Sequence, residues 1–89
     1  MSKSNNLLQL LYNEYCQKLK NGISEPKAKM FGSSKDIQKS IASQYSFEVV
    51  DELCRELDEN NFLDVFYADN IAYNVQISDI GIDYAKNNL

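Results

Sequence analysis

The sequence predicts an α+β domain in which three core helices are followed by a β-hairpin and an added C-terminal helix. Three observations indicate this order. Apolar residues first recur at steps of three and four, as they do in amphipathic helices. They then alternate with polar residues over 71–77, and Ser78 offers a helix N-cap directly afterwards. A chain of 89 residues has room for one domain, which we place at residues 1–89.

The first helix is predicted over residues 5–20, because its apolar residues lie on one helical face and Gly22 follows as a helix-ending residue. The residues of that face are Leu8, Leu11, Tyr12, Tyr15 and Leu19. Pro26 is expected beyond the helix, since proline cannot continue one. The following "AKMF" is predicted to be either a short edge strand or a loop.

A second, short helix is predicted over residues 34–43. Ser33 and Asp36 have the spacing of a capping box, with aspartate in place of the usual glutamate, and Ile37 and Ile41 share one face. The helix and its successor are joined by only a few residues. The pair therefore has the pattern of a helix-turn-helix.

The third helix is predicted over residues 47–60, with Ser46 as its N-cap and Tyr45 packing onto Val50 across the first turn. Its inward residues are Val50, Leu53, Cys54 and Leu57. The other face is rich in carboxylates, so this helix is strongly amphipathic.

A β-hairpin is predicted over residues 62–77, with its turn at Ala68-Asp69-Asn70. The residues expected on one face of its second strand are Ile71, Tyr73, Val75 and Ile77, whereas those expected on the other are Ala72, Asn74 and Gln76. Ser78 then caps a last helix over residues 79–88, in which Ile77 is expected to pack onto Ile82.

The end of the chain carries a motif that many small winged-helix proteins have after the second strand of the wing, of the type L-T-x-x-G-x-x-Y-L. In "ISDIGIDYA", the Leu, Thr, Gly and Tyr positions of this motif are occupied by Ile77, Ser78, Gly81 and Tyr84, and Ala85 stands where the last leucine would be. Upstream, "FEVVDELCRELDENNFLDVFY" looks like the third helix and first wing strand of this group. The chain resembles the YjcQ-like winged-helix proteins of Gram-positive bacteria and their phages.

The resemblance implies a winged helix-turn-helix fold in which Ser78, Gly81 and Tyr84 serve the structure. Serine caps the helix, glycine permits close packing beside the wing, and tyrosine anchors the helix to the core. It also implies binding of double-stranded DNA, with the third helix entering the major groove. In this chain that helix departs from the expectation, because acidic residues dominate its outer face and repel phosphates.

A different set of residues is therefore predicted for DNA contact. Residues 1–45 hold seven lysines against three carboxylates, a net charge of +4, whereas residues 46–89 have a net charge of −8. Four lysines lie within thirteen residues around the start of the second helix, and the turn after it offers two further polar side chains. The predicted DNA-binding residues are Lys27, Lys29, Lys35, Lys39, Gln44 and Tyr45.

The alternative function is an acidic protein-interaction module that does not bind DNA. Its third helix docks on a basic protein surface, as in an accessory factor or inhibitor encoded by a phage or mobile element. The predicted protein-binding residues, all on or beside the outer face of that helix, are Glu48, Asp51, Glu52, Arg55 and Glu59. The opposite charges of the two halves also allow a homodimer.

Two surface features discriminate between these functions. A continuous lysine patch from the second helix to the hairpin favours DNA. Exposure of Phe31, Phe66 or Tyr67 beside an acidic face favours a protein partner.

Catalysis and cofactor binding are not expected. Histidine is absent, and the three glycines lack the spacing of phosphate-binding loops, so neither a common general base nor a nucleotide cradle is present. Cys16 and Cys54 are isolated and predicted to be buried, so no disulfide or metal site is expected. With no long apolar run, the chain is predicted to be cytoplasmic and independent of membranes.

Overall fold

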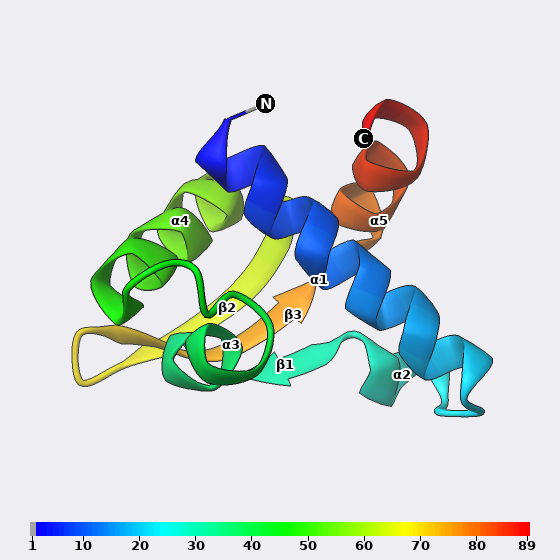
Figure 1. Cartoon of the computed structure of the whole chain (residues 1–89), viewed down its shortest axis with the longest axis horizontal. Coiled ribbons are helices and arrows are strands. Elements are labelled where there is room, and N and C mark those ends of the chain that lie inside the picture. Colours follow the sequence, from blue (N-terminus) through cyan, green and yellow to red (C-terminus); the bar gives the residue numbers. More distant parts are fainter. Residues whose placement is uncertain (1) are drawn as a thin grey trace.

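The computed structural model describes residues 2–89, which form an α+β fold of five helices and one three-stranded antiparallel sheet (Figure 1). The elements in chain order are α1 (Lys3–Lys20), α2 (Glu25–Ala28), β1 (Met30–Gly32), α3 (Ser34–Ser40), α4 (Phe47–Glu59), β2 (Leu63–Ala68), β3 (Ile71–Ile77) and α5 (Asp79–Asn88). This order and the strand order β1-β3-β2 are compatible with the predicted winged-helix layout. Within the same residues, none of the helices is long and apolar enough to span a membrane.

Serine caps set the starts of four helices. The capping box of α3 is present in both directions: the Ser33 hydroxyl accepts from the Asp36 N–H, and the Asp36 carboxylate accepts from the Ser33 N–H. Ser46 and Ser78 cap α4 and α5 as predicted. Ser2 caps α1, which therefore begins two residues before the predicted start.

Pro26 lies beyond α1 as predicted, but it stands in the first turn of the short helix α2, which was not predicted and where its missing N–H costs nothing. Two local predictions are wrong. The helix predicted to reach residue 43 ends at Ser40, because the Ile41 backbone leaves helical geometry. Cys16 is exposed, whereas Cys54 is buried as expected.

β1 is an edge strand of the sheet, so the first of the two alternatives for "AKMF" is confirmed. The turn between β2 and β3 consists of Asp69 and Asn70, which have φ of 53° and 62°. Two successive residues with positive φ make a turn whose twist matches that of the flanking strands, and Asp and Asn tolerate this geometry. The hairpin is therefore specified by its own turn residues.

The predicted facing of β3 is correct for Val75 and Ile77 but wrong near the turn. Phe66 pairs with Asn74 and Tyr67 pairs with Ala72, so Tyr73 is an additional residue that forms a β-bulge. Beyond the bulge the alternation shifts by one position. Ala72 is consequently buried and Tyr73 exposed, so Tyr73 does not share a face with Val75 and Ile77 as predicted.

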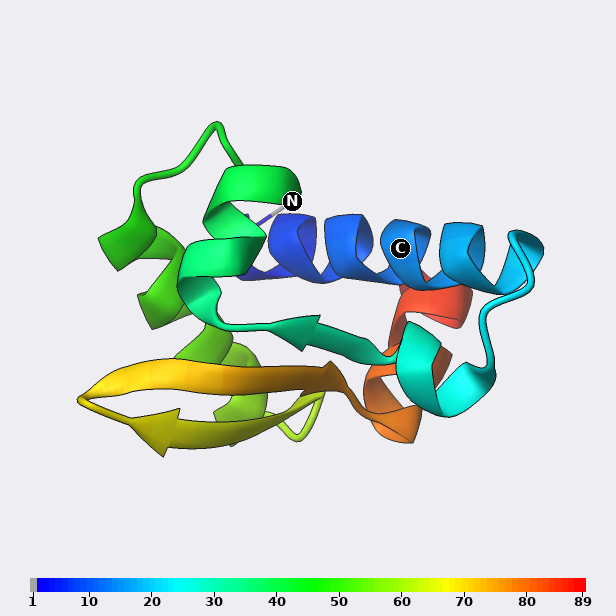
Figure 2. The same ribbon diagram turned by 90° about the horizontal axis from the view of Figure 1, so that it is seen from below.

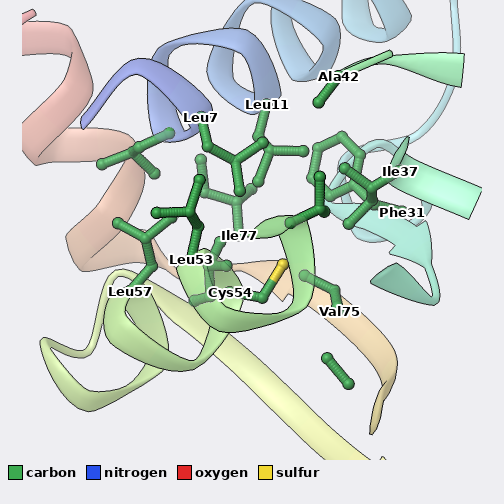
Figure 3. Packing of buried hydrophobic residues seen from close by; sticks show 14 of the residues in the cluster. Leu7, Leu11, Phe31, Ile37, Ala42, Leu53, Cys54, Leu57, Val75 and Ile77 are labelled. Carbon is green, nitrogen blue, oxygen red and sulfur yellow. The ribbon is translucent and has the colours of Figure 1, made fainter. Parts of the chain in front are cut away.

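The hydrophobic core lies between the helices and one face of the sheet. Leu7 and Leu11 of α1 meet Leu53 and Leu57 of α4 there, with Ile77 of β3 beside them (Figure 3). In Figure 2 the hairpin lies at one side of the molecule and α1 toward the other, with β1 between them. The inward residues predicted for the third helix, Val50, Leu53, Cys54 and Leu57, are all buried.

α5 is fixed to the loop before β2 through close packing. Gly81 lies against the backbone of Phe62, and the rings of Phe62 and Tyr84 stack with centroids 4.4 Å apart. The Ser78 hydroxyl accepts from the Gly81 N–H and donates to the Asn61 carbonyl at 2.6 Å. Serine, glycine and tyrosine of the terminal motif thus have the structural roles predicted for them.

Candidate functional site

The predicted DNA-binding lysines do not form one patch. Lys27 lies in α2 and Lys29 caps it, whereas Lys35 and Lys39 lie in α3, at the opposite end of β1 (Figure 1). Lys29 is also engaged within the protein, because its Nζ contacts Asp79 Oδ1 at 2.6 Å and its side chain is only 20% exposed. The hydrogen bond to Asp79 raises the pKa of Lys29.

Of the residues predicted to contact DNA near α3, Lys35, Lys39 and Gln44 are exposed. Lys35 Nζ lies 5.3 Å from the centroid of the Phe47 ring, a weak cation–π contact. Tyr45 is placed differently, because it is half-buried and its hydroxyl accepts a 2.7 Å hydrogen bond from Asn6 Nδ2 of α1. Tyr45 therefore joins the turn to α1.

The outer face of α4 carries a row of four exposed glutamates, Glu48, Glu52, Glu56 and Glu59. Successive members are three or four residues apart and share one face of the helix. The ion pairs among residues 2–89 are Lys29–Asp79 and Arg55–Asp51, so none involves this row. We call these four residues the glutamate row.

Asp51, which was predicted to face outward with them, points into the protein instead. Its side chain is 13% exposed, and its Oδ1 accepts from the Ser34 hydroxyl at 2.8 Å and from the Ala72 N–H at 2.7 Å. Its Oδ2 accepts from Arg55 Nε at 3.0 Å. One carboxylate thus links α3, α4 and β3, and it is not free to bind a partner.

Arg55 is likewise engaged within the protein. Besides its bond to Asp51, it donates through Nη2 to the Asn70 carbonyl in the hairpin turn, at 2.5 Å. Its guanidinium lies 4.8 Å from the centroid of the Tyr67 ring, and the Tyr67 hydroxyl donates to Asp58 at 2.7 Å. Burial and this bond to a carboxylate raise the pKa of Tyr67 to about 12. These contacts hold the hairpin against α4.

The Asp51 contacts predict an acid-dependent loss of stability. Burial raises the pKa of Asp51, but the hydrogen bonds from Ala72, Ser34 and Arg55 together outweigh burial and hold it below the ordinary 3.8. A depressed pKa contributes stability that is complete above the unfolded-state value of about 3.9 and is lost as pH falls through the folded-state value. In urea unfolding from pH 5 to pH 2, we expect the difference in unfolding free energy between wild type and Asp51→Asn to shrink below pH 4. A constant difference would contradict this.

A hollow of about 420 Å³ lies between the start of α1 and α4. Its lining residues are Ser2, Lys3, Ser4, Val49, Glu52, Leu53 and Glu56. The sequence indicated Glu52 as a site residue, but it did not indicate Glu56, Lys3 or Val49. Periodicity shows which face of a helix is apolar, whereas the position at which two helices meet depends on the assembled core.

The three aromatic residues that discriminate between the predicted functions differ in their exposure to solvent. Phe66 is 65% exposed, Tyr67 is exposed on the same strand, and Phe31 is only 8% exposed. The hairpin contains no lysine or arginine, so no continuous basic patch joins α3 to it. The exposed aromatic residues and the acidic face of α4 therefore meet the criteria for a protein partner better than those for DNA.

Of the two free cysteines, Cys16 is exposed and Cys54 is buried. Burial raises the pKa of the Cys54 thiol to about 12, so it remains protonated at neutral pH. No group of three or more acidic or cysteine side chains in residues 2–89 is arranged to hold a metal ion.

Comparison with protein-family models, curated proteins and solved structures finds no match to this chain.

Proposed function

We propose that this chain is a noncatalytic binding module with the winged-helix layout, and that it binds a basic surface on another protein through α4. The glutamate row is the observation that carries this proposal. Like charges three or four residues apart repel each other by a few tenths of a kcal/mol per pair, and no cation among residues 2–89 is paired with them. A feature that costs stability and is uncompensated is expected at a functional surface.

The arrangement around α4 also supports a protein partner over DNA. In the winged-helix layout α4 is the helix that meets the major groove, and an exposed acidic row there repels phosphates. The hairpin turn consists of Asp69 and Asn70 and offers no cation for the minor groove. The resemblance to YjcQ-like phage proteins fits an accessory factor or inhibitor that acts by docking on a basic protein.

DNA binding is the second candidate, because Lys35 and Lys39 are exposed one turn apart on α3. In this mode α3 contacts backbone phosphates and α4 stays outside the groove. It predicts weak, sequence-independent and strongly salt-dependent association.

Fluorescence anisotropy with two labelled probes separates these functions. The probes are an arginine- and lysine-rich peptide and a random-sequence DNA duplex, each measured at 50 mM and 200 mM salt. We expect the peptide to bind at 50 mM and to weaken at 200 mM, while the duplex does not bind. Glu48→Lys combined with Glu52→Lys should abolish peptide binding.

Two further variants control the result. Glu14→Lys with Asp83→Lys makes the same change in net charge away from α4, and it should retain peptide binding. Lys35→Glu with Lys39→Glu should also retain it. If the wild type binds the duplex and Lys35→Glu with Lys39→Glu abolishes that binding, the DNA function is established instead. Failure of the peptide to bind at 50 mM would overturn the proposal.

A further inference from the structure

The hollow between α1 and α4 combines charge with an apolar floor. Val49 is half-buried and Leu53 is only 6% exposed, so the floor offers aliphatic surface that solvent only partly reaches. Glu52 and Glu56 of the glutamate row line the same hollow one helical turn apart. The other two members of the row, Glu48 and Glu59, do not line it.

This combination matches one side chain better than the others. Arginine has an aliphatic stem that packs against apolar surface and a planar guanidinium with five N–H donors. Positions four residues apart on a helix have Cβ atoms roughly 5–6 Å apart, so one guanidinium can donate to both carboxylates. Lysine offers a compact ammonium without this fork.

We infer that the hollow is the anchor site for an arginine side chain of the basic partner. The guanidinium lies between Glu52 and Glu56, and the methylene groups lie against Val49 and Leu53. This inference rests on the proposed function and names the residue of the partner that the acidic face selects. The hollow is complementary in charge to a guanidinium, because two carboxylates without an ion pair among residues 2–89 border an apolar floor.

Lys3 has a second consequence, because it is the one cation among the described residues that lines the hollow. Its ammonium makes no ion pair with either glutamate among the described residues, yet it disfavours a second cation nearby. Replacing Lys3 by serine should therefore strengthen arginine binding. Serine at this position keeps the polar character that Ser2 and Ser4 give to the same wall.

The test uses N-acetyl-arginine-N-methylamide as the probe and methyl NMR of the folded protein as the readout. We expect saturable shifts of the Val49 and Leu53 methyl groups, and no comparable shifts of Val75, which is buried elsewhere in the core. The citrulline analogue has the same shape without the charge and should give no saturable shift. Equal responses to the two probes, or no response at Val49, would overturn the inference.

Matched charge variants separate this inference from the proposed function. Glu52→Gln with Glu56→Gln should weaken binding of the arginine probe by roughly tenfold or more, because both charge-assisted hydrogen bonds are lost. Glu48→Gln with Glu59→Gln removes the same charge from the same helix outside the hollow and should leave probe binding nearly unchanged. If the two variants weaken the basic peptide equally and neither affects the arginine probe, the acidic face binds proteins without an arginine anchor. If neither affects the peptide, the proposed function fails as well.

Discussion

Replacing Gly81 by alanine is expected to destabilise the fold by about 3 kcal/mol or more, which is at the upper end of the cost of overpacking a core. A methyl group at Gly81 would overlap the Phe62 carbonyl oxygen and lie 2.9 Å from its carbonyl carbon. These are backbone atoms, so no side-chain rotation can relieve the contact. α5 must move away, and the stacking of Phe62 on Tyr84 weakens with it.

Thermal unfolding measures this effect, with Gly22→Ala as the matched control. Gly22 has φ of 87°, and a methyl group added there would meet no atom within 4 Å outside the adjacent residues, so alanine meets only the cost of the left-handed conformation, about 1 kcal/mol. For a domain of this size each kcal/mol lowers Tm by roughly 4–8 °C. Gly81→Ala should therefore lower Tm by roughly 12–24 °C. A loss no greater than that of Gly22→Ala would mean that α5 is not held by this contact.

The features of the fold that the sequence predicted are mostly local. Ser33, Ser46 and Ser78 could be recognised as caps because a cap depends on residues within one helical turn. The hairpin could be placed because Asp69 and Asn70 favour its turn on their own. Tertiary contacts rarely override such signals, because the residues that carry them interact mainly with their own neighbours in the sequence.

The errors occurred where tertiary pairing decides the outcome. The exposed position of Tyr73 follows from a bulge, and a bulge depends on the register between two strands and not on the alternation within one. Cys16 was assigned to the inner face of the first helix, whereas the core contacts only the stripe that includes Leu11 and Tyr15. Helical periodicity gives the direction of the buried face but not its width.

The candidate site was predicted in the same uneven way. Glu48, Glu52 and Glu59 could be placed on the outer face of α4 from spacing alone, and they are exposed. Asp51 has the same residue class and nearly the same position on the helix, but it binds Ser34 and Ala72 from two other elements. The sequence of α4 alone does not show that Asp51 is engaged within the protein whereas the glutamates are exposed. The distinction becomes visible only when α3 and the hairpin are in place.

Replacing Asp51 by alanine is the second change for which we expect a large loss, about 3 kcal/mol. Ser34 and Ala72 are fully buried, so the substitution leaves a buried hydroxyl and a buried backbone N–H without their acceptor. An unsatisfied buried donor costs about 1–3 kcal/mol. Arg55 loses a partner too, but its side chain is partly exposed and water can replace that bond.

Urea unfolding and amide hydrogen exchange together test this role. Glu52→Ala, one residue further along α4, should leave the unfolding free energy nearly unchanged, as surface substitutions usually do. Asp51→Asn should lie between wild type and alanine, because its amide oxygen can still accept from Ala72. Since Asp51 and Arg55 both hold the hairpin to α4, exchange of the Ala72 N–H should accelerate far more in Asp51→Ala than exchange in α1. Equal acceleration throughout the chain would mean that Asp51 supports global stability only. Acceleration confined to β3 would show that one carboxylate sets the position of the hairpin relative to the glutamate row.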